Sequence, residues 1–160
     1  MTEVYLLLGS NLQNPALQLE IARQRLAEKA GIIVSESPVY RSAPWGVEDQ
    51  PEFANQVLCI ETRFSALELL KCLQTIELNM GRKRIVKWGS RIIDIDILYY
   101  NKQIITQDTL KIPHPELQNR RFTLVPLCDI APDFIHPVFN ISNQTMLQRC
   151  KDEGKVIRIQ

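Results

Sequence analysis

The chain has 160 residues, of which 45% are hydrophobic and 23% are charged, and its formal net charge at pH 7 is +1. These values are typical of one globular domain, residues 1–160, that can bury a core without disulfides or a structural metal. They argue against a broadly basic nucleic-acid surface, and the apolar run near the N-terminus is too short for a signal peptide or a membrane span. We therefore expect a cytoplasmic monomer that binds neither nucleic acid nor a membrane.

The first part of the chain alternates predicted strands and helices. Residues 3–9 form an apolar run that predicts a buried strand ending at Gly9. A helix is predicted next, with Asn14 as its N-cap, Pro15 in the first turn and Gly31 just after its end. Residues 32–42 predict a second strand, in which Pro38 marks an edge position or a bulge.

The following segments continue this alternation. Residues 53–64 predict a third strand, residues 65–81 a helix with a capping box of Ser65 and Glu68, and residues 91–101 a fourth strand. This order predicts an α+β fold with a ferredoxin-like βαββαβ core, in which an antiparallel sheet carries two helices on one face. The last sixty residues contain five prolines and predict a C-terminal extension of short elements, including a helix over 121–131.

The fourth predicted strand carries two acidic side chains in an otherwise apolar run. Asp94 and Asp96 share one face of the strand, while Ile93, Ile95 and Ile97 share the other. The two aspartate Cα atoms would lie roughly 6.6 Å apart, so both carboxylates can bind one or two divalent cations. Burying unpaired charge is costly, which favours a cation or another partner beside them. A solvated strand face is the alternative interpretation.

Basic residues flank the acidic pair along the sequence. Residues 82–91 contain five lysines and arginines and no acid, and His114 and Arg120 follow downstream. Carboxylates for a metal beside guanidinium groups for phosphate are what phosphoryl transfer requires. A solvated basic loop and a buried core histidine are the alternatives. The chain has no P-loop and no GxGxxG motif, so side chains and metal would have to hold a triphosphate.

Four blocks of sequence resemble one enzyme family. They are LGSN at 8–11, VYRSAPWG with QPEFANQV within 39–57, IELNMGRKR at 76–84, and WGSRIIDIDILYYN, IPHPELQNRRF and PLCDIAP within 88–132. On these residues the chain is similar to the 6-hydroxymethyl-7,8-dihydropterin pyrophosphokinases of folate synthesis. The resemblance implies transfer of the β,γ-pyrophosphoryl group of ATP to the hydroxymethyl oxygen of the pterin, with release of AMP.

The resemblance also implies a set of catalytic and ATP-binding residues, with ATP as co-substrate. Asp94 and Asp96 would bind two Mg²⁺ ions, Arg91 would act beside them, and Arg82 corresponds to a loop arginine that assists catalysis and product release. Residues at ATP-site positions are Leu70, Gln74, Glu77, Arg84, Trp88, Arg91, Ile97, Lys111, His114 and Arg120.

A second implied set would bind the pterin. It comprises Ser42, Ala43, Pro44, Trp45, Phe53, Asn55 and Phe122. Asn55 is expected to hydrogen-bond the edge of the heterocycle, while Trp45 and Phe122 bracket its faces. Ala43, Trp45 and Phe53 depart from the residues of some other members, and residues 140–160 match no part of the family pattern. We also expect the loops that contain Trp45 and Trp88 to close over the substrates.

Two other functions fit parts of the pattern. The ferredoxin-like order also occurs in RNA-binding and regulatory domains, but RNA binding favours aromatic residues where this chain has Asp94 and Asp96. A nucleotide-sugar transferase with a DxD motif would need a larger nucleotide-binding domain. Binding of ATP that depends on Mg²⁺ discriminates, because the enzyme requires it and an RNA-binding module does not.

Overall fold

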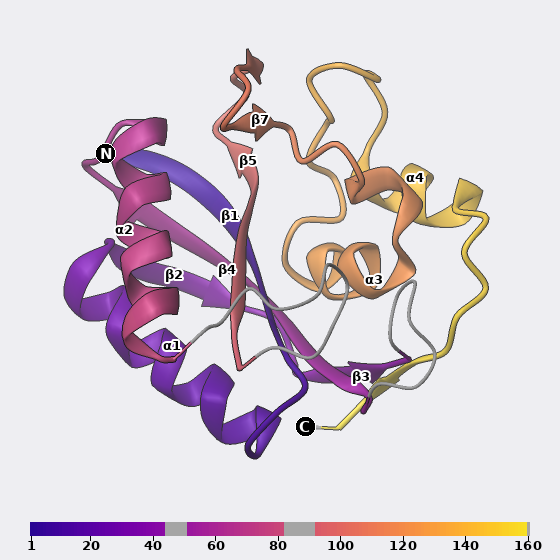
Figure 1. The fold of residues 1–160 in the computed structure, drawn as a ribbon. Coiled ribbons are helices and arrows are strands. Elements are labelled where there is room, and N and C mark those ends of the chain that lie inside the picture. Colours follow the sequence, from indigo (N-terminus) through magenta and orange to yellow (C-terminus); the bar gives the residue numbers. More distant parts are fainter. Residues whose placement is uncertain (44–50, 82–91, 160) are drawn as a thin grey trace.

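The computed structural model describes residues 1–43, 51–81 and 92–159, and these form a central sheet with helices on both faces (Figure 1). The strands are β1 (Thr2–Ser10), β2 (Ile32–Glu36), β3 (Tyr40–Ser42), β4 (Phe53–Thr62), β5 (Asp94–Tyr100), β6 (Ile105–Thr106), β7 (Lys111–Ile112) and β8 (Val156–Arg158). The helices are α1 (Pro15–Lys29), α2 (Ala66–Asn79), α3 (Arg121–Ile130) and α4 (Asn143–Arg149), and a 3-10 turn, η1, covers Leu117–Asn119. The predicted α+β class is therefore confirmed.

The main sheet is antiparallel, as the sequence predicts. Its order is β5-β1-β4-β3-β8, with β2 also paired to β4, while β6 and β7 form a separate two-stranded sheet. The predicted second strand is divided into β2 and β3, and Pro38 lies between them. Both halves pair with β4. Between them, the Ser37 amide donates to the Val57 carbonyl oxygen and the Val57 amide donates to the Ser37 hydroxyl oxygen, so contact with β4 is not interrupted. The C-terminal extension adds β8 to the sheet, an element that the sequence did not predict.

The helices on the first face confirm most of the predicted end signals. Ser65 and Glu68 form the predicted capping box of α2, and Gly31 follows α1 where a Cβ would lie 2.2 Å from the Glu61 carbonyl oxygen. Asn14 occupies the N-cap position of α1, but the prediction of a capping side chain is wrong. Its φ is 59° and its side chain makes no cap bond, because such a bond requires an extended backbone at that position.

The two faces of the sheet bury separate apolar clusters. Leu6, Leu58 and Ile97 pack against α1 and α2 on one face, as the sequence predicts. On the other face Leu7 and Val57 pack against α3 and α4, which lie across the sheet from α1 and α2 in Figure 1. No described helix has the combination of length and apolarity needed to cross a membrane. The C-terminal extension thus supplies the cover for the face on which the acidic pair lies.

A bulge in β5 changes its side-chain alternation. Leu6 of β1 pairs with Ile97, and the neighbouring Tyr5 pairs with Tyr99, so Leu98 is the extra residue. Ile97 belongs to the cluster under α1 and α2, whereas Leu98 and Tyr99 both belong to the cluster under α3. Bulges of this kind re-aim side chains next to active sites.

Candidate active site

A row of cross-strand partners brings the predicted metal and pterin residues together. Gly9 of β1 is the register partner of both Asp94 on β5 and Asn55 on β4. Leu7, two residues earlier, pairs with Asp96. Directly opposed residues in a sheet project to the same face, so both aspartates and Asn55 lie on the face covered by α3. Residues of three strands that are far apart in the sequence therefore lie side by side on one face of the sheet.

Gly9 lies at the centre of this row, a position that the sequence reasoning did not single out. A Cβ placed on it would lie 3.3 Å from Oδ1 of Asn55 and 3.8 Å from Cδ1 of Phe53. A side chain here would therefore press on two predicted pterin residues, next to the strand that carries Asp94. The only sequence signal was its place in the LGSN block, since Gly9 was interpreted as a strand end.

The side chain of Asn55 is oriented by a buried hydrogen bond. Its Nδ2 donates to Oγ of Ser42 at 2.7 Å, and both residues are buried. The amide oxygen is consequently turned to the Gly9 side, 3.3 Å from the place that a Cβ on Gly9 would take. Phe53 is half-buried beside it, and Ala43, at the end of β3, is exposed.

The start of α3 lies over the same face of the sheet. Phe122 is half-buried against the α3-side cluster, and the Arg120 guanidinium carbon lies 5.7 Å from its ring centroid. Burial lowers the pKa of Arg120, which is 8% exposed, while Asp96, Glu116 and Asp94 act in the opposite direction. A buried guanidinium and both aspartates therefore share one electrostatic environment, and an aromatic ring lies beside them.

His114 presents a neutral imidazole to the same region. Its Nδ1 accepts a hydrogen bond from the Glu116 backbone amide at 3.1 Å. Burial, with a further contribution from Arg120, lowers the pKa of His114 to about 4. The ring is therefore neutral at pH 7 and carries its proton on Nε2, because Nδ1 is the acceptor. Nε2–H is then a donor without positive charge, which suits contact with a phosphate oxygen.

A cavity of about 280 Å³ runs along the edge of β5 and is called the edge cavity below. Its lining residues are Leu70, Ile95, Asp96, Ile97, Asp108, Thr109, Leu110, Lys111, His114 and Pro115. Four predicted ATP-binding residues (Leu70, Ile97, Lys111 and His114) are thus brought together with Asp96. The volume is near the lower end for small-molecule sites, about 300 Å³.

Two other predicted ATP-binding residues lie on α2. Gln74 is exposed, one turn after Leu70. Glu77 is 7% exposed, and its Oε2 accepts a hydrogen bond at 2.9 Å from the backbone amide of Ile95. Glu77 therefore satisfies a backbone donor on the outer edge of β5, a role that the sequence did not indicate.

The remaining predicted site residues lie outside the described ranges. They are Pro44 and Trp45 of the pterin set, and Arg82, Arg84, Trp88 and Arg91 of the catalytic and ATP sets. The hypothesis of closing loops concerns these same segments.

The acidic pair has the chemistry of a magnesium site. Asp94 and Asp96 are half-buried hard oxygen donors on one strand face. Over the residues described, no group of three or more His, Cys, Asp or Glu side chains is placed to hold a metal. Mg²⁺ is commonly held by one or two carboxylates together with substrate phosphates and water, so the pair fits the ion as part of a substrate complex.

The carboxylate pair with a neighbouring arginine and imidazole is typical of the class of enzymes that transfer phosphoryl groups. A family model described as 7,8-dihydro-6-hydroxymethylpterin-pyrophosphokinase matches residues 5–132. The chain belongs to this family.

Individual relatives agree with the family match. The chain is 42% identical over 149 residues to the 2-amino-4-hydroxy-6-hydroxymethyldihydropteridine pyrophosphokinase of Haemophilus influenzae, covering 92% of this chain and 93% of that protein. The Pseudomonas aeruginosa protein of the same name is 44% identical over 137 residues, covering 84% of this chain and 83% of its own. The chain also covers 24% of the Folic acid synthesis protein FOL1 of Dictyostelium discoideum, at 41% identity.

Solved structures support the fold alone. The Plasmodium falciparum HPPK-DHPS structure with pteroate superposes with a TM-score of 0.77 at 19% identity. The match covers 92% of this chain and 42% of that one, so this chain spans under half of the structure that it resembles.

Proposed function

We propose that the chain transfers the β,γ-pyrophosphoryl group of ATP to the hydroxymethyl oxygen of 6-hydroxymethyl-7,8-dihydropterin, a step of folate biosynthesis. The pterin oxygen forms a bond to the β-phosphorus, the bond from that phosphorus to the α-phosphate oxygen breaks, and AMP leaves. The hydroxyl proton is lost to solvent or a neighbouring acceptor. The row Asn55–Gly9–Asp94 carries the proposal, because the Asn55 amide and the carboxylate pair lie on one face of adjacent strands.

The pterin site is proposed to lie over Gly9. Ser42 orients Asn55, whose amide oxygen accepts from an N–H on the edge of the heterocycle. The Phe122 ring supplies a face for stacking at the start of α3. Ala43, Pro44, Trp45 and Phe53 complete the proposed set.

The ATP site is proposed to run along the edge cavity and across β5. Leu70 and Ile97 supply apolar surface for the base, and Lys111 an exposed positive charge. Nε2–H of His114 and the guanidinium of Arg120 donate to phosphate oxygens. Gln74, Glu77, Arg84, Trp88 and Arg91 belong to the same proposed set, and Arg82 and Arg91 to the catalytic one.

Asp94 and Asp96 are proposed to hold two Mg²⁺ ions. Bound magnesium would neutralise the triphosphate and orient the two reacting oxygens. The carboxylates themselves fix the position of that charge, because both belong to one strand whose register is set by β1. Arg120 balances the pair from α3 and stabilises negative charge on the transferred group.

We further propose a monomer in the cytoplasm, where ATP is available.

Release of AMP tests the proposed reaction. The purified chain would be incubated with ATP, Mg²⁺ and the reduced pterin alcohol, and nucleotide products would be separated by chromatography. We expect AMP and pterin pyrophosphate in equal amounts, with neither formed when Mg²⁺ or pterin is omitted. Formation of ADP in place of AMP would contradict pyrophosphoryl transfer.

A further inference from the structure

The N-terminus of α3 is capped by a residue far along the chain. Arg120 stands at the N-cap position, and its side chain makes no cap hydrogen bond. Instead, Oδ2 of Asp152 accepts from the backbone amide of Arg121 at 3.1 Å. A carboxylate at this position satisfies an unpaired amide and interacts favourably with the helix dipole. The start of α3, which carries Phe122, is therefore held from outside the helix.

Asp152 is itself fixed by its local turn. Its second oxygen, Oδ1, accepts from the backbone amide of Gly154 at 2.9 Å. Both carboxylate oxygens are thus engaged, and the side chain is half-buried. Asp152 is part of residues 151–159, called the C-terminal tail below, which lie beyond the segment matched by the family model.

The same tail also pairs with β3, the strand that carries Ser42 of the proposed pterin site. Strand β8 pairs with β3, so that Val156 opposes Ser42 and Arg158 opposes Tyr40. The Ile159 amide extends this contact by donating to the Val39 carbonyl oxygen at 2.9 Å. Because Ser42 orients Asn55, the tail supports the strand that positions the heterocycle-reading amide.

A third contact connects β3 and α3 directly. The hydroxyl group of Tyr40 on β3 donates to Oδ2 of Asp129 on α3. Each of these three elements therefore contacts the other two. Asp152 joins the tail to α3, Tyr40 joins β3 to α3, and the β3–β8 pairing joins the tail to β3.

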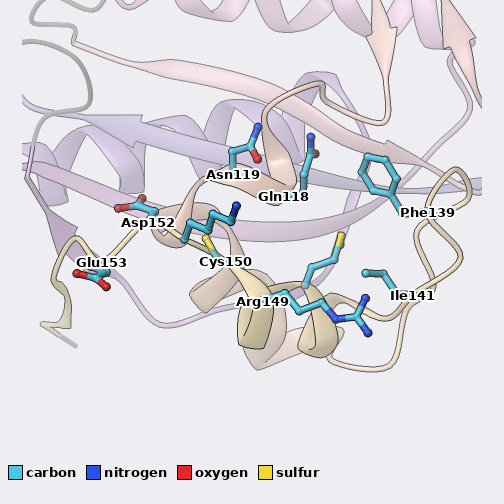
Figure 2. Close-up of a pocket in the computed structure, with 10 residues that line it drawn as sticks. Gln118, Asn119, Phe139, Ile141, Arg149, Cys150, Asp152 and Glu153 are labelled. Atoms are coloured by element: carbon cyan, nitrogen blue, oxygen red, sulfur yellow. The ribbon is translucent and has the colours of Figure 1, made fainter.

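Part of the tail borders a cavity. A cavity of about 680 Å³ separates part of the tail from η1 and α4, and Asp152, Asn119 and Cys150 are among its lining residues (Figure 2). In Figure 2, Asp152 lies on the opposite side of this cavity from Phe139. This part of the tail therefore has little packing against η1 and α4, and the Asp152 hydrogen bond is a specific contact that fixes it to the start of α3.

We propose that the C-terminal tail is a brace that sets the distance between Phe122 on α3 and Asn55 on β4. Asp152 is the positioning residue of this brace. This rests on the proposed function, since it takes Phe122 and Asn55 as the pterin contacts. Asp152 acts through the amide of Arg121 and touches no substrate. Loss of the bond displaces the start of α3. The pterin then loses its stacking partner and the nucleotide loses part of one contact, that with Arg120, while the edge cavity keeps its shape.

Calorimetry on the full chain tests the brace, with 6-hydroxymethyl-7,8-dihydropterin as the titrant in the presence of Mg²⁺ and a non-hydrolysable ATP analogue. Asp152→Ala is expected to weaken pterin binding by about tenfold and binding of the nucleotide analogue by no more than about threefold, since Arg120 is the only proposed nucleotide contact next to the lost bond. Asp152→Asn should recover most of the loss, because asparagine and aspartate cap helices almost equally well. Glu153→Ala, at the exposed neighbouring acid, should leave both affinities unchanged.

A second variant removes the same bond from the other side. Arg121→Pro deletes the donor amide at the first helical position, where proline is well tolerated. The extended backbone of Arg120, with φ −118° and ψ 109°, also suits a residue before proline. This variant should match Asp152→Ala in pterin affinity, the double variant should be no worse, and Arg121→Ala should resemble the parent.

Three outcomes would overturn the brace. One is unchanged pterin affinity in both Asp152→Ala and Arg121→Pro, together with lost affinity in Asn55→Ala. This result would exclude the brace and support the proposed pterin site. Another is an equal loss for both ligands together with a lowered unfolding midpoint, which would show a general structural role. The last is unchanged affinity in Asn55→Ala and Phe122→Ala as well, in which case the proposed pterin site would fail together with the brace.

Discussion

The backbone amide of His114 donates a hydrogen bond of 3.0 Å to the carbonyl oxygen of Leu98, the extra residue of the β5 bulge. Asp96 precedes Leu98 by two residues on the same strand. The bulge therefore connects two parts of the proposed site, because its carbonyl group anchors the histidine beside the carboxylate pair. It also explains how a loop residue lines the edge cavity together with Asp96.

Removing either carboxylate should abolish turnover without loss of the fold. Asp94→Asn and Asp96→Asn keep the shape of each side chain and remove a charge that a metal requires. We expect turnover to fall by about 10³ or more, in line with the loss of charge stabilisation in a phosphoryl-transfer site. Asp108→Asn, which changes another carboxylate in the edge cavity, should remain near the parent. Turnover within tenfold of the parent at saturating Mg²⁺ would show that the pair does not hold the metal.

The donor on His114 should matter more than its charge. Because the imidazole is neutral at pH 7, His114→Gln keeps an amide donor near the Nε2 position, whereas His114→Ala removes it. We expect the alanine variant to raise KM for ATP by about tenfold, the cost of roughly one hydrogen bond to a charged group, and the glutamine variant to recover part of it. Steady-state kinetics at fixed, saturating pterin would measure this. Equal KM values in the two variants would contradict a donor role.

A methyl group at Gly9 should block the pterin and spare the fold. In Gly9→Ala the new Cβ would lie 3.3 Å from Oδ1 of Asn55, in the space where a bound N–H group would approach to about 2.9 Å. Pterin affinity should fall by at least about tenfold, the equivalent of a lost hydrogen bond, with little change in affinity for Mg·ATP. Calorimetry with each ligand checks this. Ser10→Ala, on the adjacent residue and the opposite face, is the control, and an equal loss there would contradict the assignment.

Local patterns in the sequence predicted the elements that bury a regular apolar face. Alternation around Asp94 and Asp96 placed Ile93, Ile95 and Ile97 together, and all three lie in the cluster under α1 and α2. The capping box at Ser65 also marked the start of α2 correctly. In these cases the decisive interactions are between residues close in the sequence.

Features that depend on distant pairing could not be predicted in this way. Strand β8 has three residues, none of them fully buried, so it shows no alternation, and only pairing with β3 defines it. The cap of α3 comes from Asp152, 31 residues beyond the amide that it accepts from. The importance of Gly9 also depends on its two neighbouring strands, which supply Asn55 and Asp94.

The second histidine of the chain is buried among aromatic rings and is suited to a test of acid stability. His136 is 3% exposed, and its Nδ1 accepts from the backbone amides of Val138 at 3.1 Å and Phe139 at 3.2 Å. Its ring stacks on Phe139 at 4.4 Å between centroids. Burial lowers its pKa, and protonation at Nδ1 would remove the acceptor of both hydrogen bonds.

Stability should therefore fall as the pH falls through the range in which His136 becomes protonated. The unfolded chain binds this proton near pH 6.5 and the folded chain only at lower pH, so between these values the unfolded state holds more protons and the free energy of unfolding rises with pH. His136→Asn keeps an acceptor near Nδ1 and removes the titration. Urea unfolding at pH 7.5 and pH 5 should show a smaller loss on acidification for this variant than for the parent. Carboxylates contribute equally to both proteins, so the difference isolates the histidine. An identical loss in the two proteins would mean that His136 titrates alike in the folded and unfolded states.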